Sequence, residues 1–325
     1  MLVYFIRRLG QSALVLVVMA LLVFVGIYAI GNPVDVLISP EADLAEQQAT
    51  VERLGLDKPL WEQLWLFLVN ALGGDLGRSF VHGEPALQLI LDRLPATMEL
   101  ALVALVFAVT VGVFLGLWAG LRPDSLLGRS IMTGSILGFS LPNFWLGLML
   151  ILVFAVYLQW LPAGGRGDTV DLLGIRTSLL TLDGWSHLLL PAITLALYKT
   201  SLVIRLARAG TREVALQDYV KFARAKGLSA ARVTYVHVLK NIMIPVVTVI
   251  GLELGSMIAF AVVTETVFAW PGIGKLLIDS IVNLDRPVVV AYLMMTVFIF
   301  ILINLAVDLL YSLLDPRVRL SEAKA

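Results

Sequence analysis

Polar side chains inside strongly apolar stretches are the residues of this sequence best placed to do chemistry. Glu253 lies within the apolar run Val246–Phe268, and Asn143 and Asn304 lie in two other such runs. A charged group in hydrocarbon costs roughly 2.5–3.5 kcal/mol on insertion scales, so membrane proteins keep such groups mainly for function. We expect Asn143, Glu253 and Asn304 to line a polar path through a membrane or to face a partner chain. A carboxylate in such a path can bind a cationic amino group.

Two further carboxylates, Glu99 and Asp308, lie near the ends of apolar stretches. We expect both to reach water or to cap something nearby. Asp308 follows Asn304 by four residues, so on a helix the two side chains share a face.

Residues for covalent or nucleotide chemistry are missing from the sequence. It has no cysteine, which excludes disulfides, thiolate metal sites and a cysteine nucleophile. The segment Pro271–Leu276 is superficially similar to a phosphate-binding loop. However, Ala269 stands where the Walker A motif has its first glycine, and Leu276 stands where the motif has serine or threonine. We expect a structural turn before a short helix there, and no catalytic site, cofactor or metal in this chain. The histidines are far apart and lack the spacing of metal ligands: His82, His187 and His237.

The composition predicts an integral membrane protein. Of 325 residues, 59% are hydrophobic, and the mean hydropathy is +0.91, which would leave large apolar patches on a soluble domain. The first apolar run is longer than the about 7–15 residues of a signal sequence, so we expect an uncleaved anchor. Six segments are long enough to cross ~30 Å of hydrocarbon as helices: Leu9–Ile30, Ala96–Gly120, Ile131–Leu158, Leu188–Leu206, Val246–Phe268 and Pro287–Leu310.

The distribution of charge predicts that both termini are cytoplasmic. With that orientation the interior segments carry 16 Lys and Arg against five acidic residues, and the exterior segments carry eight against fifteen. The positive-inside rule places the basic segments in the cytoplasm. The zero net charge of the whole chain argues against a nucleic-acid partner. We expect an all-α fold with six transmembrane helices, divided into an anchor with an exterior loop (1–95) and a five-helix core (96–325).

The exterior loop contains a predicted helix over Leu60–Leu72. Its leucines and tryptophans recur at helical spacing, and Gly73 and Gly74 follow it. The helix is too short to span a bilayer and is rich in tryptophan, which is typical of amphipathic helices at the membrane interface. A helix that packs on the membrane domain explains the same pattern, and both explanations can hold together.

The polar segment 207–245 separates two apolar spans. Residues 199–245 carry nine of the 24 Lys and Arg but only two acidic residues. A run of helix-forming residues leads up to Gly227, which can adopt positive φ at a helix end without a Cβ clash. Ser229 can cap the following helix, Ala230–Asn241. The pattern predicts two short helices joined at a bend, which is a suitable surface for docking a cytoplasmic partner.

Glycines recur every four residues in two of the predicted spans: Gly112, Gly116 and Gly120 in one, and Gly251 and Gly255 in the other. Small residues at this spacing allow helices to approach closely in lipid. We expect contacts within this chain, although an interface with a second chain also fits the spacing.

A set of motifs spread over nearly the whole chain carries a family resemblance: Leu56–Leu60, Gly74–Ser79, Arg93–Glu99, Leu141–Trp145, Leu161–Gly165, Asp218–Ser229, Glu265–Gly274 and Asp315–Arg319. The segment Asp218–Ser229 resembles the EAA loop of binding-protein-dependent ABC importer permeases, in the form found in peptide and nickel transporters. The whole pattern is similar to the B-type permease subunit for dipeptides or oligopeptides.

The resemblance implies a type I ABC importer permease fold in a bacterial plasma (inner) membrane. It further implies a homologous second permease subunit, two cytoplasmic ATPase subunits that bind ATP and Mg, and an exterior solute-binding protein that delivers peptides. ATP-driven closure of the ATPases would move the loop helices and switch the path between inward-facing and outward-facing states. The matching positions of the coupling loop are Asp218, Tyr219, Ala223, Arg224, Ala225, Lys226, Gly227, Leu228 and Ser229.

The match departs from the broad family in two places. Lys221 or Phe222 stands where most members have the glutamate of EAA, and the gap from Gly227 to Ile242 is longer than usual. Both departures are typical of the peptide branch, which also imports nickel chelates, glutathione and other small solutes. A stand-alone ion-coupled transporter remains the second possibility, because Pro142 can mark a broken helix. The lack of an obvious inverted repeat and the structured basic loop argue against it.

Overall fold

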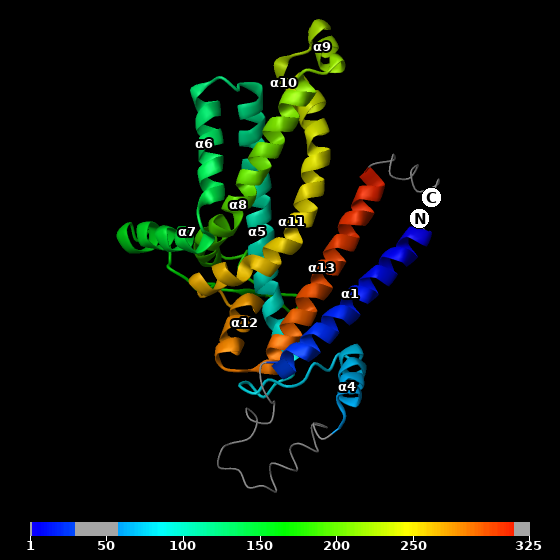
Figure 1. Cartoon of the computed structure of the whole chain (residues 1–325). Helices are drawn as coiled ribbons and strands as arrows, with labels where there is room; N and C mark the ends of the chain where they lie inside the picture. Colours follow the sequence, from blue (N-terminus) through cyan, green and yellow to red (C-terminus); the bar gives the residue numbers. More distant parts are fainter. Residues whose placement is uncertain (1, 30–57, 315–325) are drawn as a thin grey trace. The chain divides into compact units, whose positions relative to one another are not determined.

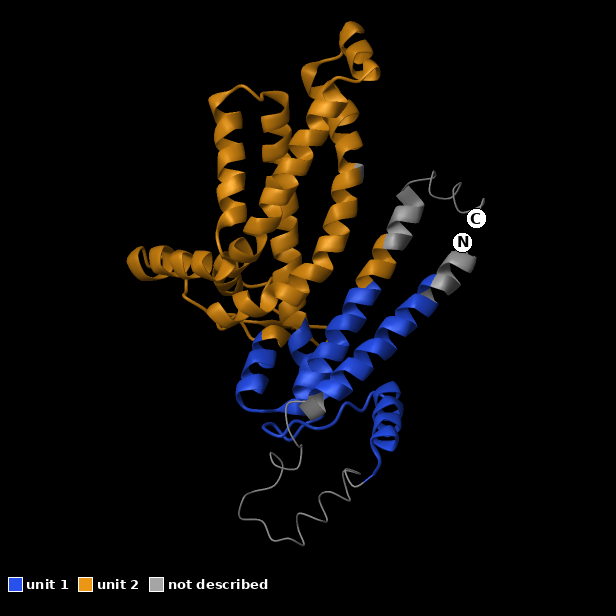
Figure 2. Ribbon diagram, in the orientation of Figure 1, with its two compact units in different colours: residues 1–94, 275–302 blue, residues 95–274, 303–325 orange. Residues whose placement is uncertain are grey.

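A computed structural model describes residues 2–29 and 58–314. The described residues are almost entirely helical, with one short antiparallel strand pair (Figure 1). They form two compact units (Figure 2). The first unit consists of Met1–Leu94 and Lys275–Leu302, and the second consists of Pro95–Gly274 and Ile303–Ala325.

The first unit contains the predicted amphipathic helix with the predicted bounds, α4 (Leu60–Leu72). Helix α4 packs against α1 (Leu2–Ala29), where the ring centroids of Phe24 and Phe67 are 6.1 Å apart. Trp61 remains exposed on α4, as does Trp65 one turn later. The helix therefore packs on the membrane domain and still presents tryptophans outward.

A buried carboxylate fixes the loop that follows α4 in the first unit. Asp285 is 1% exposed and accepts hydrogen bonds from Ser79 Oγ at 2.5 Å and from the backbone N–H of Phe80 at 3.0 Å. Ser79 Oγ in turn accepts from the backbone N–H of His82 at 2.8 Å. Ser79, the last residue of the motif Gly74–Ser79, is thus hydrogen-bonded to a carboxylate about 200 residues later in the sequence.

The second unit is organised around α8 (Leu182–Ala215), which contacts α6, α7 and α11. The buried core of the second unit consists of small and aliphatic residues from α5, α8 and α11 together with Trp270. The elements beside α8 are α5 (Ala86–Leu121), α6 (Leu126–Ser140), α7 (Asn143–Leu150), the π-helix η1 (Ile151–Tyr157), β1 (Val170–Leu172), β2 (Ile175–Thr177), α9 (Asp218–Ala225), α10 (Ala230–Arg232), the π-helix η2 (Val233–Leu239) and α11 (Lys240–Val267). The remaining helices are α12 (Ile273–Val282) and α13 (Arg286–Leu314). Both contribute residues to the two units, as does α5, whose residues 86–94 belong to the first unit.

The glycine repeat of α5 makes contacts within the chain, as predicted. A Cβ on Gly116 would lie 2.6 Å from the carbonyl oxygen of Ile204 and 2.7 Å from Ala207 Cβ, both on α8. Gly112 and Gly120 face α8 in the same way. The three glycines therefore allow the backbones of α5 and α8 to approach more closely than any side chain would permit.

Four described helices are long and apolar enough to cross a membrane: Ala86–Leu121, Leu182–Ala215, Pro245–Val267 and Arg286–Val307. A broken pair, Leu126–Ser140 with Asn143–Tyr157, is a fifth candidate, and the apolar part of α1, Gly10–Gly26, is shorter than a span.

The segment predicted as one span, Ile131–Leu158, is not one continuous helix. Helix α6 ends at Ser140, and the two halves of the pair are bent by 107°. Leu141 and Pro142 are extended, with ψ of 133° each. A proline lacks the N–H of a helix interior and disfavours helical geometry at the residue before it, which accounts for the break.

The helix predicted after Ser229 also differs from the expectation. Helix α10 covers only Ala230–Arg232, continues as the π-helix η2, and joins α11 at Lys240 without a break. The segment predicted as a separate short helix over Ala230–Asn241 is therefore the beginning of the long helix α11.

Candidate functional site

The segment Asp218–Ser229, called the elbow below, lies at one end of the second unit and connects α8 to the helical run that becomes α11 (Figure 1). Gly227 has a φ of 76°, and nothing lies within 4 Å of the position of its missing Cβ. Ser229 Oγ accepts a hydrogen bond from the backbone N–H of Arg232 at 3.3 Å. The elbow therefore has the glycine bend and the serine cap that the sequence predicts.

The apolar face of α9 packs against other helices of the second unit. Val220 and Ala223 are 0% and 5% exposed and belong to one apolar cluster with residues of α5, α8, η2 and α11, against which Leu228 also packs. The cluster members from the other helices are Leu117, Ala207, Val233, Val238 and Ile242. The apolar face of the elbow is therefore packed as part of the second unit.

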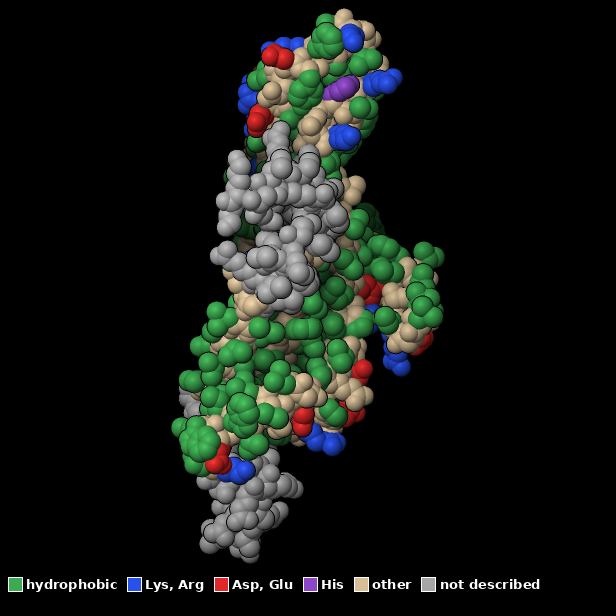
Figure 3. Space-filling model, turned by 90° about the vertical axis from the view of Figure 1, so that its right-hand side faces the viewer, with side chains coloured by type: hydrophobic (Ala, Val, Ile, Leu, Met, Phe, Trp, Pro, Cys, Tyr) green, Lys and Arg blue, Asp and Glu red, His purple; other side chains and the backbone are tan. Residues whose placement is uncertain are grey.

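The outer face of α9 combines aromatic and basic side chains. Tyr219 and Phe222 are 44% and 60% exposed. The ammonium group of Lys226 lies 4.6 Å from the ring centroid of Phe222, and Lys221 forms an ion pair with Asp218 at 2.9 Å. Several Lys and Arg side chains and fewer acidic ones lie at this end of the second unit, among hydrophobic side chains (Figure 3).

Most, but not all, of the predicted coupling-loop residues are on that outer face. Ala223 is buried and Leu228 half-buried, so they hold the elbow in place. Phe222 was not among the predicted contact residues, although it lies three residues after the exposed Tyr219 and so on the same side of α9. The exposed members of the predicted set are Asp218, Tyr219, Arg224, Ala225, Lys226, Gly227 and Ser229.

The three path candidates lie on three different helices. Asn143 begins α7 and Asn304 lies in α13, each half-buried, and Glu253 lies in α11. Glu253 forms an ion pair with Lys199 of α8. From the sequence, Lys199 was counted only among the charges of the cytoplasmic segment 199–245. The side chain of Asp308, by contrast, lies outside the described residues.

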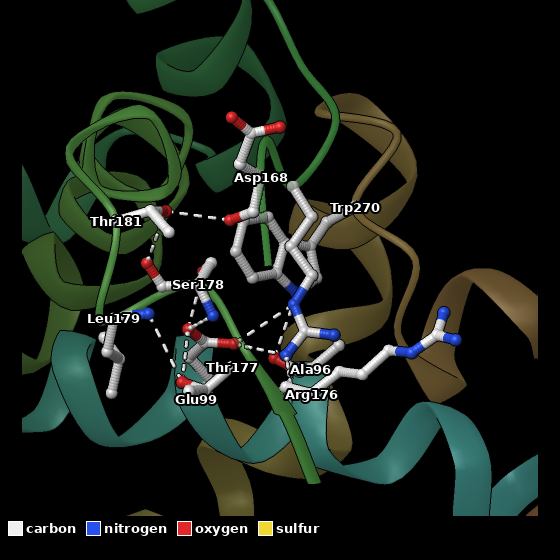
Figure 4. A network of polar contacts seen from close by, with 10 residues as sticks. Ala96, Glu99, Asp168, Arg176, Thr177, Ser178, Leu179, Thr181 and Trp270 are labelled. Atoms are coloured by element: carbon white, nitrogen blue, oxygen red, sulfur yellow. Dashed lines mark hydrogen bonds and ion pairs between the residues drawn. The ribbon is translucent and has the colours of Figure 1, made fainter. Parts of the chain in front are cut away.

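Of the two roles expected for Glu99, reaching water or capping something, the first is excluded because the residue is buried, and its carboxylate instead binds side-chain and backbone donors (Figure 4). It accepts from Arg166 Nε at 3.1 Å and from the backbone N–H of Ser178 at 2.8 Å. Arg166 also donates to the carbonyl oxygen of Arg176 at 2.7 Å. An arginine 67 residues away in the sequence thus compensates the charge, and the pair ties the β1–β2 segment to α5.

A second buried carboxylate, Glu265, organises the turn before α12. It is 0% exposed and accepts from Thr97 Oγ1 at 2.6 Å, and this hydroxyl accepts from the backbone N–H of Ile273 at 2.9 Å. A Cβ on Gly272 would lie 2.3 Å from Glu265 Oε1. These contacts make Pro271–Leu276 a structural turn before a short helix, as predicted.

Two family models together match most of the chain. The model described as "Binding-protein-dependent transport system inner membrane component" matches residues 112–320. The model for the N-terminal part of such membrane components matches residues 1–101. The chain belongs to this family. It is therefore the inner membrane component, or permease, of a binding-protein-dependent transport system.

Relatives of this permease are similar over nearly their full length. It is 42% identical to the di/tripeptide transport system permease protein DppB of Pseudomonas aeruginosa, over 98% of this chain and 99% of the relative. It is 37% identical to the dipeptide transport system permease protein DppB of Escherichia coli K12, with the same coverage of 98% and 99%. The glutathione transport system permease protein GsiC of that strain is 38% identical, again over 98% and 99%.

The fold of the permease is also found in a solved transporter. A chain of the methionine ABC transporter MetNI, in an inward-facing conformation, aligns with a TM-score of 0.57 at 15% identity. The alignment covers 70% of this permease and 97% of that chain. The likeness establishes the membrane-subunit fold of an ABC transporter.

Proposed function

We propose that this permease is one of two membrane-spanning subunits of an ABC importer for dipeptides or oligopeptides. The observation that carries the proposal is the elbow, whose apolar face is buried in the second unit and whose aromatic and basic face is free for a partner. The full-length similarity to di- and tripeptide permeases supports the substrate class.

The proposed topology has six transmembrane helices with both termini in the cytoplasm, in the type I importer fold. Helix α1 supplies the sixth span, because its helix continues beyond the apolar part Gly10–Gly26 to 28 residues in all. At 1.5 Å per residue, a helix of this length exceeds the ~30 Å of hydrocarbon. The basic charge of the elbow then lies on the cytoplasmic side.

In this mechanism two cytoplasmic ATPases bind ATP and Mg, and each docks on the elbow of one permease subunit. Closure of the ATPases displaces the elbow, and α8 and α11 move with it because both are packed against its apolar face. The binding energy of ATP then favours one of two permease states through contacts that differ between them. An exterior solute-binding protein delivers the peptide, and Asn143, Glu253 and Asn304 line its path.

Replacing Ala225 by aspartate is expected to weaken docking of the ATPases. Ala225 is exposed at the end of α9, so the folded elbow accommodates the new side chain. A negative charge between Arg224 and Lys226 reduces the positive potential that we expect the ATPase to recognise. The two surfaces are then less complementary in charge at the centre of the contact. Co-purification of the ATPases with the tagged permease should fall several-fold, and Ala225→Ser serves as the matched neutral control. Equal recovery of the ATPases with both variants would contradict docking at this face.

Reconstitution of the complete transporter tests the proposed function. Proteoliposomes with this permease, the second permease, the ATPases and the binding protein should take up a labelled dipeptide only with ATP and Mg. Glutathione belongs in the same panel, because a glutathione permease is as similar to this chain as one of the dipeptide permeases. Uptake by this permease alone, driven by a pH gradient, would instead establish the ion-coupled transporter.

A further inference from the structure

We propose that Lys199 and Glu253 together form the binding site for the two charged ends of a zwitterionic peptide inside the permease. The carboxylate of Glu253 binds the α-ammonium group of the peptide, and the ammonium group of Lys199 binds its α-carboxylate. The inference rests on the proposed function, since it names the residues that hold a peptide within the path.

The two side chains meet between α8 and α11, which pack against each other. Lys199 contacts the carboxylate of Glu253 and donates to Ser256 Oγ at 2.9 Å. Ser256 Oγ also donates to Glu253 Oε2 at 2.8 Å. The ring centroid of Tyr198 lies 5.2 Å from Lys199 Nζ, and this ring stacks on Phe139 at 4.6 Å. The site thus offers an anion, a cation and an aromatic wall within one small region.

The contrast with the Glu99–Arg166 pair indicates that the Lys199–Glu253 pair is not merely structural. The Glu99 side chain is 5% exposed and is held by a backbone N–H together with an arginine. Glu253 is 27% exposed, and the donors described for its carboxylate are both side-chain groups, which rotate freely compared with a backbone N–H. A carboxylate held in this way can exchange partners without disrupting the helices around it.

Exchange of partners keeps every charge compensated. In the empty permease Lys199 and Glu253 neutralise each other, so neither is left alone among apolar helices. When a zwitterion enters, one ion pair becomes two, and no buried charge loses its partner. A peptide with one blocked end would separate the pair and leave Lys199 or Glu253 uncompensated, which is costly in a low-dielectric environment.

The test compares three peptides in the complete reconstituted transporter: Ala-Ala, N-acetyl-Ala-Ala and Ala-Ala amide. For each peptide, uptake by a variant is divided by uptake by the wild type, so the selectivity of the binding protein cancels. Glu253→Gln should reduce uptake of Ala-Ala about tenfold or more, as expected for loss of a charged hydrogen bond, while the ratio for N-acetyl-Ala-Ala rises above one, because the carboxylate that this peptide leaves uncompensated is gone. Lys199→Met should reduce uptake of Ala-Ala equally and raise the ratio for the amide above one.

The matched control is Lys275→Met, which removes one partner of an ion pair with Asp279 at 2.6 Å on α12. Its ratio should stay near one for all three peptides. Equal losses of all three peptides in Glu253→Gln and Lys199→Met would show that the pair only ties α8 to α11, and would overturn the inference while leaving the proposed function intact. A wild-type complex that carries none of the peptides would overturn both.

A second measurement decides the matter if the wild type transports only Ala-Ala. The chain has no cysteine, so Ser256→Cys places its one thiol beside the pair while both charges remain. Ala-Ala at millimolar concentration should slow alkylation of this thiol in the purified complex, whereas N-acetyl-Ala-Ala amide should not. Equal protection by both peptides, or protection by neither, would overturn the inference.

Discussion

Replacing Gly227 by valine is expected to stop most peptide uptake while ATP hydrolysis continues. Gly227 has a φ of 76°, a region that costs a residue with a Cβ roughly 1–2 kcal/mol and a β-branched residue more. Since nothing lies within 4 Å of the missing Cβ, the substitution acts through the backbone and not through a clash. The bend relaxes toward negative φ, and α9 then presents its docking face in the wrong direction relative to α11.

The measurement for Gly227→Val is the number of peptides taken up per ATP hydrolysed in proteoliposomes. A misdirected elbow should lower this ratio by about tenfold, within the range of typical coupling free energies between sites. Gly227→Asn is the matched control, because asparagine tolerates positive φ better than other residues with a Cβ, and it should keep most of the coupling. Unchanged coupling in the valine variant would show that the geometry of the bend does not transmit the motion.

The second large effect is expected from a single methyl group at Gly116. Its Cβ would lie 2.6 Å from the carbonyl oxygen of Ile204 and 2.7 Å from Ala207 Cβ. A helical backbone carbonyl and an alanine methyl group have no alternative rotamer that would relieve the clash, so α5 and α8 must separate. Overpacking of this kind costs typically about 1–3 kcal/mol. For a chain of this size we expect Gly116→Ala to lower the Tm in detergent by roughly 2–4 °C.

Gly134→Ala gives the matched control for Gly116→Ala. Gly134 also lies within a helix, α6, but nothing comes within 4 Å of its missing Cβ. Alanine is favoured over glycine in helix interiors by up to about 1 kcal/mol, so the Tm should stay the same or rise. Thermal unfolding curves that coincide for the two alanine variants would contradict the close approach of α5 and α8.

Features that depend on neighbouring residues were predicted well from the sequence. The bounds of α4 follow from the spacing of its leucines and tryptophans and from the glycines after it. The bend at Gly227 and the cap at Ser229 follow from the conformational freedom of glycine and from the hydrogen-bonding capacity of serine. The glycine repeat around Gly116 likewise indicated a close helix contact, although not which helix it faces.

Features that depend on distant partners were missed. The sequence marks Glu99 and Glu253 as costly carboxylates, but each finds its cation far along the chain, in Arg166 and Lys199 respectively. Local rules carry no information on such pairings, so neither the cation of Glu99 nor that of Glu253 was predicted. Similarly, Pro142 predicts a distorted helix, whereas the 107° between α6 and the following helix depends on tertiary packing.

The most direct test of the account is to find which side of the membrane the elbow faces and what it touches. The chain has no native cysteine, so Phe222→Cys places a unique thiol on the outer face of α9, where the phenylalanine is 60% exposed. Leu173→Cys, at a 97% exposed position between β1 and β2, serves as the reference for the exterior. An impermeant maleimide should label residue 222 only in inside-out vesicles and residue 173 only in right-side-out cells, and a thiol-to-amine crosslinker at residue 222 should capture an ATPase subunit. Labelling of residue 222 from outside the cell, or a complete complex that yields no crosslink to an ATPase, would contradict the account.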